Sequence, residues 1–124
     1  MAINKTVEFM RSKLEGCKPK VGIILGSGLG QFADSVEDQI IFSYDELPGF
    51  PDASVKGHAG RIILGKVQGT EVAVLQGRAH YYESGKPDIM RLPIETLKEL
   101  GCETLLLTNA AGSLRSEAKP GSVM

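Results

Sequence analysis

The pattern of apolar and polar positions along the chain predicts short helices and strands in alternation. Gly16 is the expected end of a first helix, which is indicated by four apolar residues at helical spacing: Ile3, Val7, Met10 and Leu14. The apolar runs at 21–25 and 103–108 are typical of strands buried on both faces. Between them, residues 29–36 fit a helix that opens after a group of glycines, and residues 39–44 fit another strand.

Turn-forming residues divide the rest of the chain. Residues 45–60 are rich in proline and glycine and are predicted to be a loop. Gln68 and Gly69 separate two apolar runs, which predicts a hairpin. A second loop is expected at 77–88, and a further helix over 93–100. Strands that alternate with helices, together with a hairpin, predict an α/β fold in which helices sandwich a mixed β-sheet.

The composition changes this picture little. The chain has 124 residues, of which 42% are hydrophobic and 23% charged, and its formal net charge is -1. We therefore expect one domain over 1–124, with no nucleic-acid partner and no membrane span. Two cysteines without a CxxC pair indicate reduced thiols and a cytoplasmic protein. A Pro-Gly turn gives way to the apolar residues Val123 and Met124, so the chain is expected to be truncated at the start of another strand.

The stretch GIILGSGLG, residues 22–30, leads from an apolar run into three glycines and a serine. A strand, a tight turn and a helix N-terminus together form an anion site, to which Ser27 adds a hydroxyl donor. The spacing departs from the GxGxxG dinucleotide fingerprint, although Asp45 beyond the next strand fits it, and the lysine of a Walker-type loop is missing. Phosphate binding, a small dinucleotide-binding module and a purely structural turn all stay open at this point.

Other predicted strand ends carry similar chemistry. Arg78 and His80 follow one strand, and His58 lies in a glycine-rich loop. Arginine suits phosphate oxygens, and the small residues after Asn109 leave backbone N–H groups accessible. Each residue also has an ordinary alternative, as a surface charge, a loop histidine or a turn cap. The two histidines lack metal-ligand spacing, so no metal is expected.

Four motifs occur together in this order: GIILGSGLG, GHAGR, GRAHYYE and LLLTNAAGSL. With them, nearly the whole chain resembles the N-terminal half of the trimeric class of purine nucleoside phosphorylases. The resemblance implies a nucleoside-phosphorylase-like fold, a homotrimer, and phosphorolysis of purine nucleosides to a free base and ribose 1-phosphate. Inorganic phosphate is the implied co-substrate, and no cofactor is expected.

The resemblance also implies roles for individual residues. Phosphate ligands are expected at six positions: Ser27, His58, Arg78, Ala79, His80 and, through its backbone, Ala110. Three residues carry the implied catalytic roles: His80, Glu83, which orients the phosphate site, and Asn109. The nucleoside is expected to meet Tyr82, Ala111 and Gly112. Ser84 and Ser113 stand where the family usually has glycine.

The family's base-binding glutamate and asparagine lie in its C-terminal half, and nothing in this chain matches them. The 124 residues alone are therefore expected to be inactive, and they leave the preferred purine nucleoside open. Two alternatives remain beside a purine nucleoside phosphorylase: a methylthioadenosine-type phosphorylase, and a truncated fragment without independent catalysis.

Overall fold

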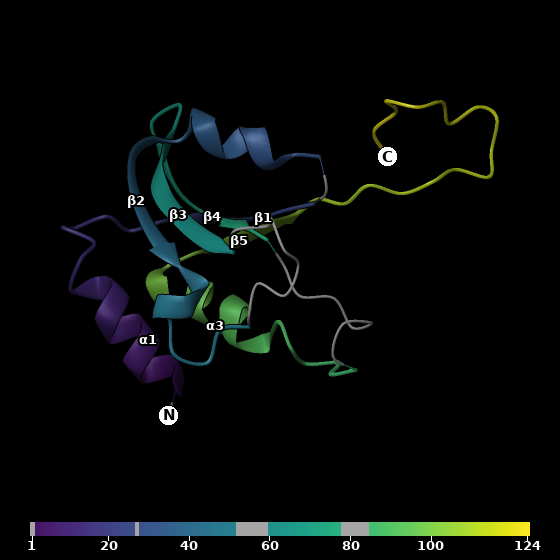
Figure 1. The fold of residues 1–124 in the computed structure, drawn as a ribbon. Helices are drawn as coiled ribbons and strands as arrows, with labels where there is room; N and C mark the ends of the chain where they lie inside the picture. The colour runs from purple at the N-terminus through teal and green to yellow at the C-terminus, as the bar shows by residue number, and fades with distance from the viewer. Residues whose placement is uncertain (1, 27, 52–59, 78–84) are drawn as a thin grey trace.

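The computed structural model describes residues 2–26, 28–51, 60–77 and 85–124 (Figure 1). Within these residues, one sheet has the strand order β2-β3-β4-β1-β5. β1 is parallel to β4 and β5, whereas β2, β3 and β4 pair antiparallel, so the predicted mixed sheet is confirmed. The strands are β1 (Val21–Leu25), β2 (Glu37–Ser43), β3 (Arg61–Val67), β4 (Thr70–Gln76) and β5 (Thr104–Leu107).

The hairpin between β3 and β4 follows from its turn residues. Gln68 and Gly69 have φ angles of 49° and 81°. Two successive positive φ angles define the tight turn whose twist matches that of antiparallel strands. Val67 therefore pairs with Thr70, and the register continues without a break to Arg61 opposite Gln76. The predicted hairpin is confirmed.

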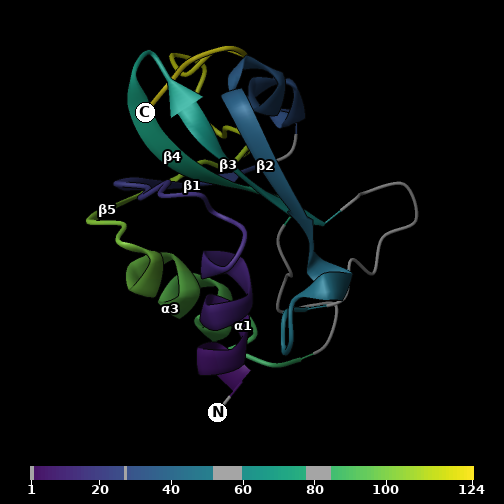
Figure 2. The same cartoon turned by 90° about the vertical axis from the view of Figure 1, so that its left-hand side faces the viewer.

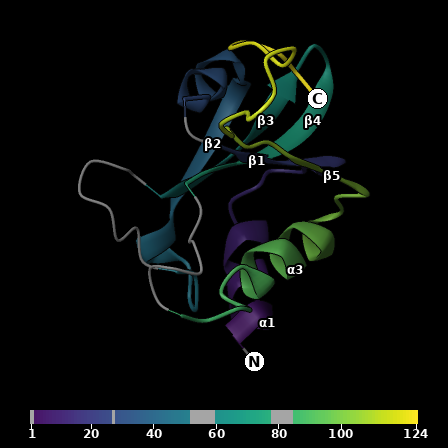
Figure 3. The same ribbon diagram turned by 90° about the vertical axis from the view of Figure 1, so that its right-hand side faces the viewer.

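Among the described residues, two α-helices cover one face of the sheet. α1 (Ala2–Arg11) and α3 (Arg91–Leu100) lie side by side beneath it (Figures 2 and 3). Met10 and Leu97 are buried against Ile24 of β1 and its neighbours in the larger hydrophobic core. This face needs helices with an apolar stripe, which the spacing of their apolar residues provides.

The opposite face is covered by a short 3-10 helix, η1 (Gly30–Ser35). Ala33 and Val36 pack there with Ile23 and Leu25 of β1 in a second, smaller core. Successive side chains of β1 thus enter opposite cores, as the alternation of a strand requires. The sheet is sandwiched as predicted, although residues 29–36 were expected to form an ordinary helix.

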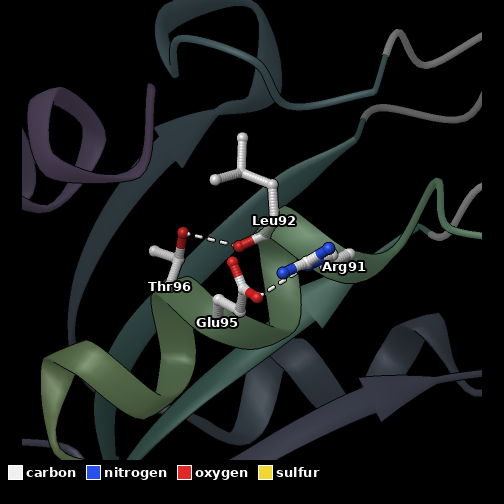
Figure 4. A network of polar contacts seen from close by, with 4 residues as sticks. All are labelled: Arg91, Leu92, Glu95 and Thr96. Carbon is white, nitrogen blue, oxygen red and sulfur yellow. Dashed lines mark hydrogen bonds and ion pairs between the residues drawn. The ribbon is translucent and has the colours of Figure 1, made fainter. Parts of the chain in front are cut away.

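α3 is held by polar contacts of its own as well as by packing (Figure 4). The buried Thr96 donates its hydroxyl to the carbonyl of Leu92 at 2.8 Å. Arg91 and Glu95 form an ion pair at 2.8 Å on the exposed side, where such pairs stabilise a helix only slightly. Gly101 has a φ angle of 116° and ends the helix, which confirms the predicted stop.

Several predicted boundaries differ from the structure by a few residues, among them those of the strand predicted at 39–44 and the helix predicted at 93–100. The first helix ends at Arg11, and the chain reaches Gly16 through turns in which Leu14 is still buried. The predicted loop at 45–60 begins instead within a second 3-10 helix, η2 (Tyr44–Glu46). Ser43 and Glu46 form a capping box at its start, which satisfies backbone N–H groups that would otherwise lack partners.

The apolar run at 103–108 forms the predicted strand, but within this chain the strand is not buried. β5 forms beside β1, but all four of its residues are exposed. β5 lies at the edge of the described sheet with one neighbouring strand, and neither α3 nor η1 covers its leucines fully. The segment after β5 extends away from the sheet (Figure 1), and Leu114, Val123 and Met124 in it are exposed.

Candidate functional site

The direction of the strands brings several chain segments to one edge of the sheet. β1, β4 and β5 are parallel, so their carboxyl ends share that edge. β3 is antiparallel to β4 and begins there, with Arg61 opposite Gln76. Gly26, Gly77 and Thr108 each directly follow one of the three parallel strands. Ligands of α/β proteins commonly bind at this edge.

The ends of β1 and β5 are in direct contact. Gly26 donates its backbone N–H to the Thr108 hydroxyl oxygen at 2.8 Å. A Cβ atom at position 26 would lie 2.7 Å from the Thr108 carbonyl oxygen and 2.8 Å from the Asn109 Cα atom. Only glycine allows so close an approach of two backbones. The structure therefore places Gly26, at the start of the glycine-rich stretch, against Thr108 and Asn109.

The end of β4 is fixed by hydrogen bonds to three other segments of the chain. The Gln76 amide donates to the Gly30 carbonyl at 3.3 Å, and its oxygen accepts a hydrogen bond from Arg61 Nε. The Tyr44 hydroxyl donates to the Gly77 carbonyl at 2.5 Å. Burial raises the pKa of Tyr44 above its usual range, so this hydroxyl stays a neutral donor at physiological pH.

The structure brings Asn109, Ala110, Ala111 and Gly112 to the edge of the sheet, where all four are exposed directly after β5. The Ser113 hydroxyl accepts from Arg115 N at 3.0 Å, so the serine in the usual glycine position supports a local turn. The remaining predicted site residues lie outside the described residues: Ser27, His58, Arg78, Ala79, His80, Tyr82, Glu83 and the variant position Ser84. Their roles stay predictions.

The dinucleotide-binding alternative does not fit the topology. That fold places its acidic residue at the end of a strand parallel to and beside the first one. Here Asp45 lies in η2 after β2, and β3 and β4 separate β2 from β1. Asp45 therefore follows a strand that runs in the same direction as β1 but is separated from it by two other strands.

Sequence reasoning missed three residues that shape this edge: Thr108, Gln76 and Tyr44. A signal was available for Gln76 and Thr108, because each is a polar residue at the end of an apolar strand. Tyr44 offered no such signal, because its partner Gly77 lies 33 positions away in the sequence. Its hydrogen bond depends on the tertiary fold alone.

The two cysteines lie away from this edge of the sheet. Cys17 and Cys102 are free thiols, and burial raises the pKa of Cys102 to about 11, so it is protonated at neutral pH. Among the described residues, no three His, Cys, Asp or Glu side chains are arranged to hold a metal ion. In the same part of the chain, the helices are too short or too polar to cross a membrane.

Comparison with known proteins identifies the family. The phosphorylase superfamily matches residues 20–124, and the chain belongs to it. Purine nucleoside phosphorylase 1 of Geobacillus stearothermophilus is 42% identical over 123 residues, which are 99% of this chain and 44% of that protein. Rat purine nucleoside phosphorylase is 38% identical over 120 residues, covering 97% of this chain and 41% of the rat protein.

Solved structures agree with this assignment. Purine nucleoside phosphorylase of Schistosoma mansoni in complex with inosine matches with a TM-score of 0.85 and 42% identity, over 97% of this chain and 41% of that one. A purine nucleoside phosphorylase bound to ribose-1-phosphate matches with a TM-score of 0.87 and 43% identity, over 96% and 43% of the two chains. The predicted family and the nucleoside-phosphorylase-like fold are confirmed. The chain spans less than half the length of these relatives.

Proposed function

We propose that this chain binds inorganic phosphate at the carboxyl edge of its sheet, as part of an enzyme that phosphorolyses purine nucleosides. The contact between Gly26 and the Thr108–Asn109 backbone carries the proposal, because it joins two of the motifs that resemble the family. β4 ends at the same edge, and Arg78 directly follows its Gly77. Relatives that bind inosine and ribose-1-phosphate support both the substrate and the product.

In the proposed reaction, a phosphate oxygen attacks the anomeric carbon of the nucleoside. A carbon–oxygen bond forms while the glycosidic carbon–nitrogen bond breaks, and the purine leaves with its bonding electrons. A phosphate dianion beneath the ribose stabilises the positive charge that develops on the sugar, so position and electrostatics supply most of the rate. The proposed phosphate ligands are those that the resemblance implies: Ser27, His58, Arg78, His80, Ala79 by its position between two ligands, and the backbone at Ala110.

The nucleoside side of the proposal rests on fewer described residues. Asn109, Ala111 and Gly112 are exposed at the edge and are available to a ligand. We assign Tyr82 to the ribose and Glu83 to the orientation of the phosphate site. The relatives compared above are purine nucleoside phosphorylases, which favours that class over a methylthioadenosine-type enzyme.

The organisation of the protein also belongs to this proposal. We take residues 1–124 as the N-terminal part of one nucleoside phosphorylase domain, with no cofactor and with purine recognition supplied by residues beyond those that match here. These residues by themselves would then bind phosphate without turning over inosine. A homotrimer follows from the resemblance, and the free thiols Cys17 and Cys102 support a cytoplasmic location.

Phosphate binding by the purified chain tests the proposal. Calorimetric titration should detect binding, and Arg78→Ala should weaken it by at least about thirtyfold, since loss of a charge-assisted contact in a desolvated site costs about 2 kcal/mol or more. Arg91→Ala is the matched control, because it removes the same charge from the exposed side of α3 and should leave binding unchanged.

Two outcomes would contradict the proposal. If the wild-type chain binds no phosphate, the proposed phosphate site is rejected. Equal binding by the wild type and Arg78→Ala would leave Arg78 as a surface charge. A separate assay of inosine cleavage at high protein concentration tests whether these residues bind phosphate but lack a purine site. Turnover above a heat-inactivated control would show that they already contain a base site.

A further inference from the structure

Thr108 connects the ends of β1 and β5 because its hydroxyl acts both as a hydrogen-bond acceptor and as a donor. Its hydroxyl oxygen accepts the Gly26 N–H at 2.8 Å. The same hydroxyl lies 3.1 Å from the Ile24 carbonyl, to which it donates. The Thr108 backbone N–H donates to that carbonyl as well, also at 3.1 Å. These three hydrogen bonds connect Thr108 with Ile24 near the end of β1 and with Gly26 just after it.

This arrangement lies where the ladder between β1 and β5 has ended. The last paired residues are Ile24 and Leu107, so Thr108 lies one residue and Gly26 two residues beyond the paired part of the two strands. The Thr108 side chain continues the connection by one further step. A side chain that both donates and accepts is required for this, and a hydroxyl is the smallest group that does so.

The connection fixes the two segments that the proposed site needs. Gly26 directly precedes Ser27, and Thr108 directly precedes Asn109. Without the hydroxyl, the Gly26 N–H would lose this hydrogen bond to the end of β5. Glycines on either side of Ser27 give that turn unusual conformational freedom, so its position depends on such anchors.

We propose that Thr108 is a positioning residue, which holds the glycine-rich turn after β1 against the Asn109 segment for anion binding. This inference rests on the proposed function, because it assumes that phosphate binds at this edge. Thr108 acts through the Gly26 peptide group, and no contact between its side chain and the phosphate is required. Its hydroxyl, and not its size, is the feature that matters.

Three variants separate the hydroxyl from shape and from general stability. Thr108→Val keeps the shape and removes the hydroxyl, whereas Thr108→Ser keeps the hydroxyl and removes the methyl group. Thr96→Val is the matched control, because Thr96 also donates its hydroxyl to a backbone carbonyl but does so within α3 (Figure 4). Phosphate affinity is measured by calorimetric titration, and exchange of the Gly26 amide by NMR in the absence of phosphate.

Thr108→Val should bind phosphate about five- to tenfold more weakly, which corresponds to loss of one neutral hydrogen bond with its partner left unsatisfied. Its Gly26 amide should exchange faster even without phosphate. Thr108→Ser should bind within about twofold of the wild type, and Thr96→Val should change neither phosphate affinity nor Gly26 exchange.

The outcomes that overturn the inference differ from those that overturn the proposed function. Phosphate binding by Thr108→Val at wild-type strength, or equal losses in the Val and Ser variants, would reject the role of the hydroxyl while the phosphate site stands. Absence of binding in the wild type would reject both. If Thr108→Val does not fold, phosphate titration of the wild type followed by NMR still tests the inference. The Gly26 and Thr108 amide resonances should shift together, and a titration that moves neither rejects the inference.

Discussion

β1 and β5 are neighbours in one sheet, run in the same direction and are both strongly apolar, yet they differ greatly in burial. The register pairs Ile23 with Leu106 and Ile24 with Leu107, so paired side chains project from the same face. In β1 the exposed fractions are 6% for Ile23, 2% for Ile24 and 6% for Leu25. In β5 they are 38% for Leu105, 51% for Leu106 and 61% for Leu107.

The difference shows that an apolar run indicates a strand but does not by itself bury it. β1 has a strand on each side and lies between two hydrophobic cores. In the described part of the chain β5 has one neighbouring strand, and the helix and the 3-10 helix that cover β1 leave its leucines exposed. Since hydrophobic stabilisation follows the area removed from water, the two strands should contribute very unequally to folding.

The largest effect is expected in the buried strand. Ile24→Ala should lower the free energy of unfolding by about 3 kcal/mol, because it removes three carbon atoms from the larger core and leaves a cavity. Chemical denaturation measures this loss. Leu107→Ala, at the paired position of β5, is the control and should cost about 0.5 kcal/mol or less. Similar losses at the two positions would mean that β5 is covered in solution.

The contact between the two strand ends offers the next largest effect. Gly26→Ala should destabilise the fold by about 2 kcal/mol, because the new Cβ atom would meet the backbone of Thr108 and Asn109. It should also abolish phosphate binding, which titration would detect. Gly112→Ala is the control, since a Cβ atom there meets nothing within 4 Å. An unchanged Gly26→Ala variant would show that the two segments are further apart in solution.

A smaller effect is expected at the end of β4, which is the other neighbour of β1 and is buried. Tyr44→Phe removes the hydrogen bond to Gly77 at the end of β4 and should cost about 1 kcal/mol at neutral pH. Because burial raises the pKa of Tyr44, the unfolded chain loses this proton first as the pH rises above about 10. The wild type should therefore lose its advantage over Tyr44→Phe at alkaline pH.

Thermal or denaturant unfolding of both proteins at neutral pH and at about pH 11 measures that advantage. Tyr81 and Tyr82 are present in both proteins, so their ionisation cancels in the difference. An advantage that stays constant with pH would show that Tyr44 is accessible to water.

The smallest effect on stability is expected in β5 itself. Leu106→Lys should change the free energy of unfolding by no more than about 0.5 kcal/mol, because Leu106 is half exposed. It should reduce self-association, since a lysine protects an exposed strand edge from pairing with another chain. Light scattering over a range of concentrations measures this. A loss of stability as large as that of Ile24→Ala would instead place Leu106 in a covered position.

Much of the fold could be predicted because its causes are local. The two residues of the β3–β4 turn specify the hairpin, and Gly101 specifies the end of α3. The bounds of β1 follow from its five-residue apolar run between polar and glycine residues. The candidate site was predicted through its motifs, of which Asn109 to Gly112 are described and lie at the expected edge.

The sequence by itself determined which segments become helices, strands and turns, because side-chain periodicity and backbone preference act over a few residues. Tertiary structure alone decided three further things. It left β5 exposed, it placed two strands between β1 and the strand before Asp45, and it joined Gly26 to Thr108 across 82 positions of sequence. Each depends on which distant segments become neighbours in the sheet, and that choice is made by the packing of the whole chain.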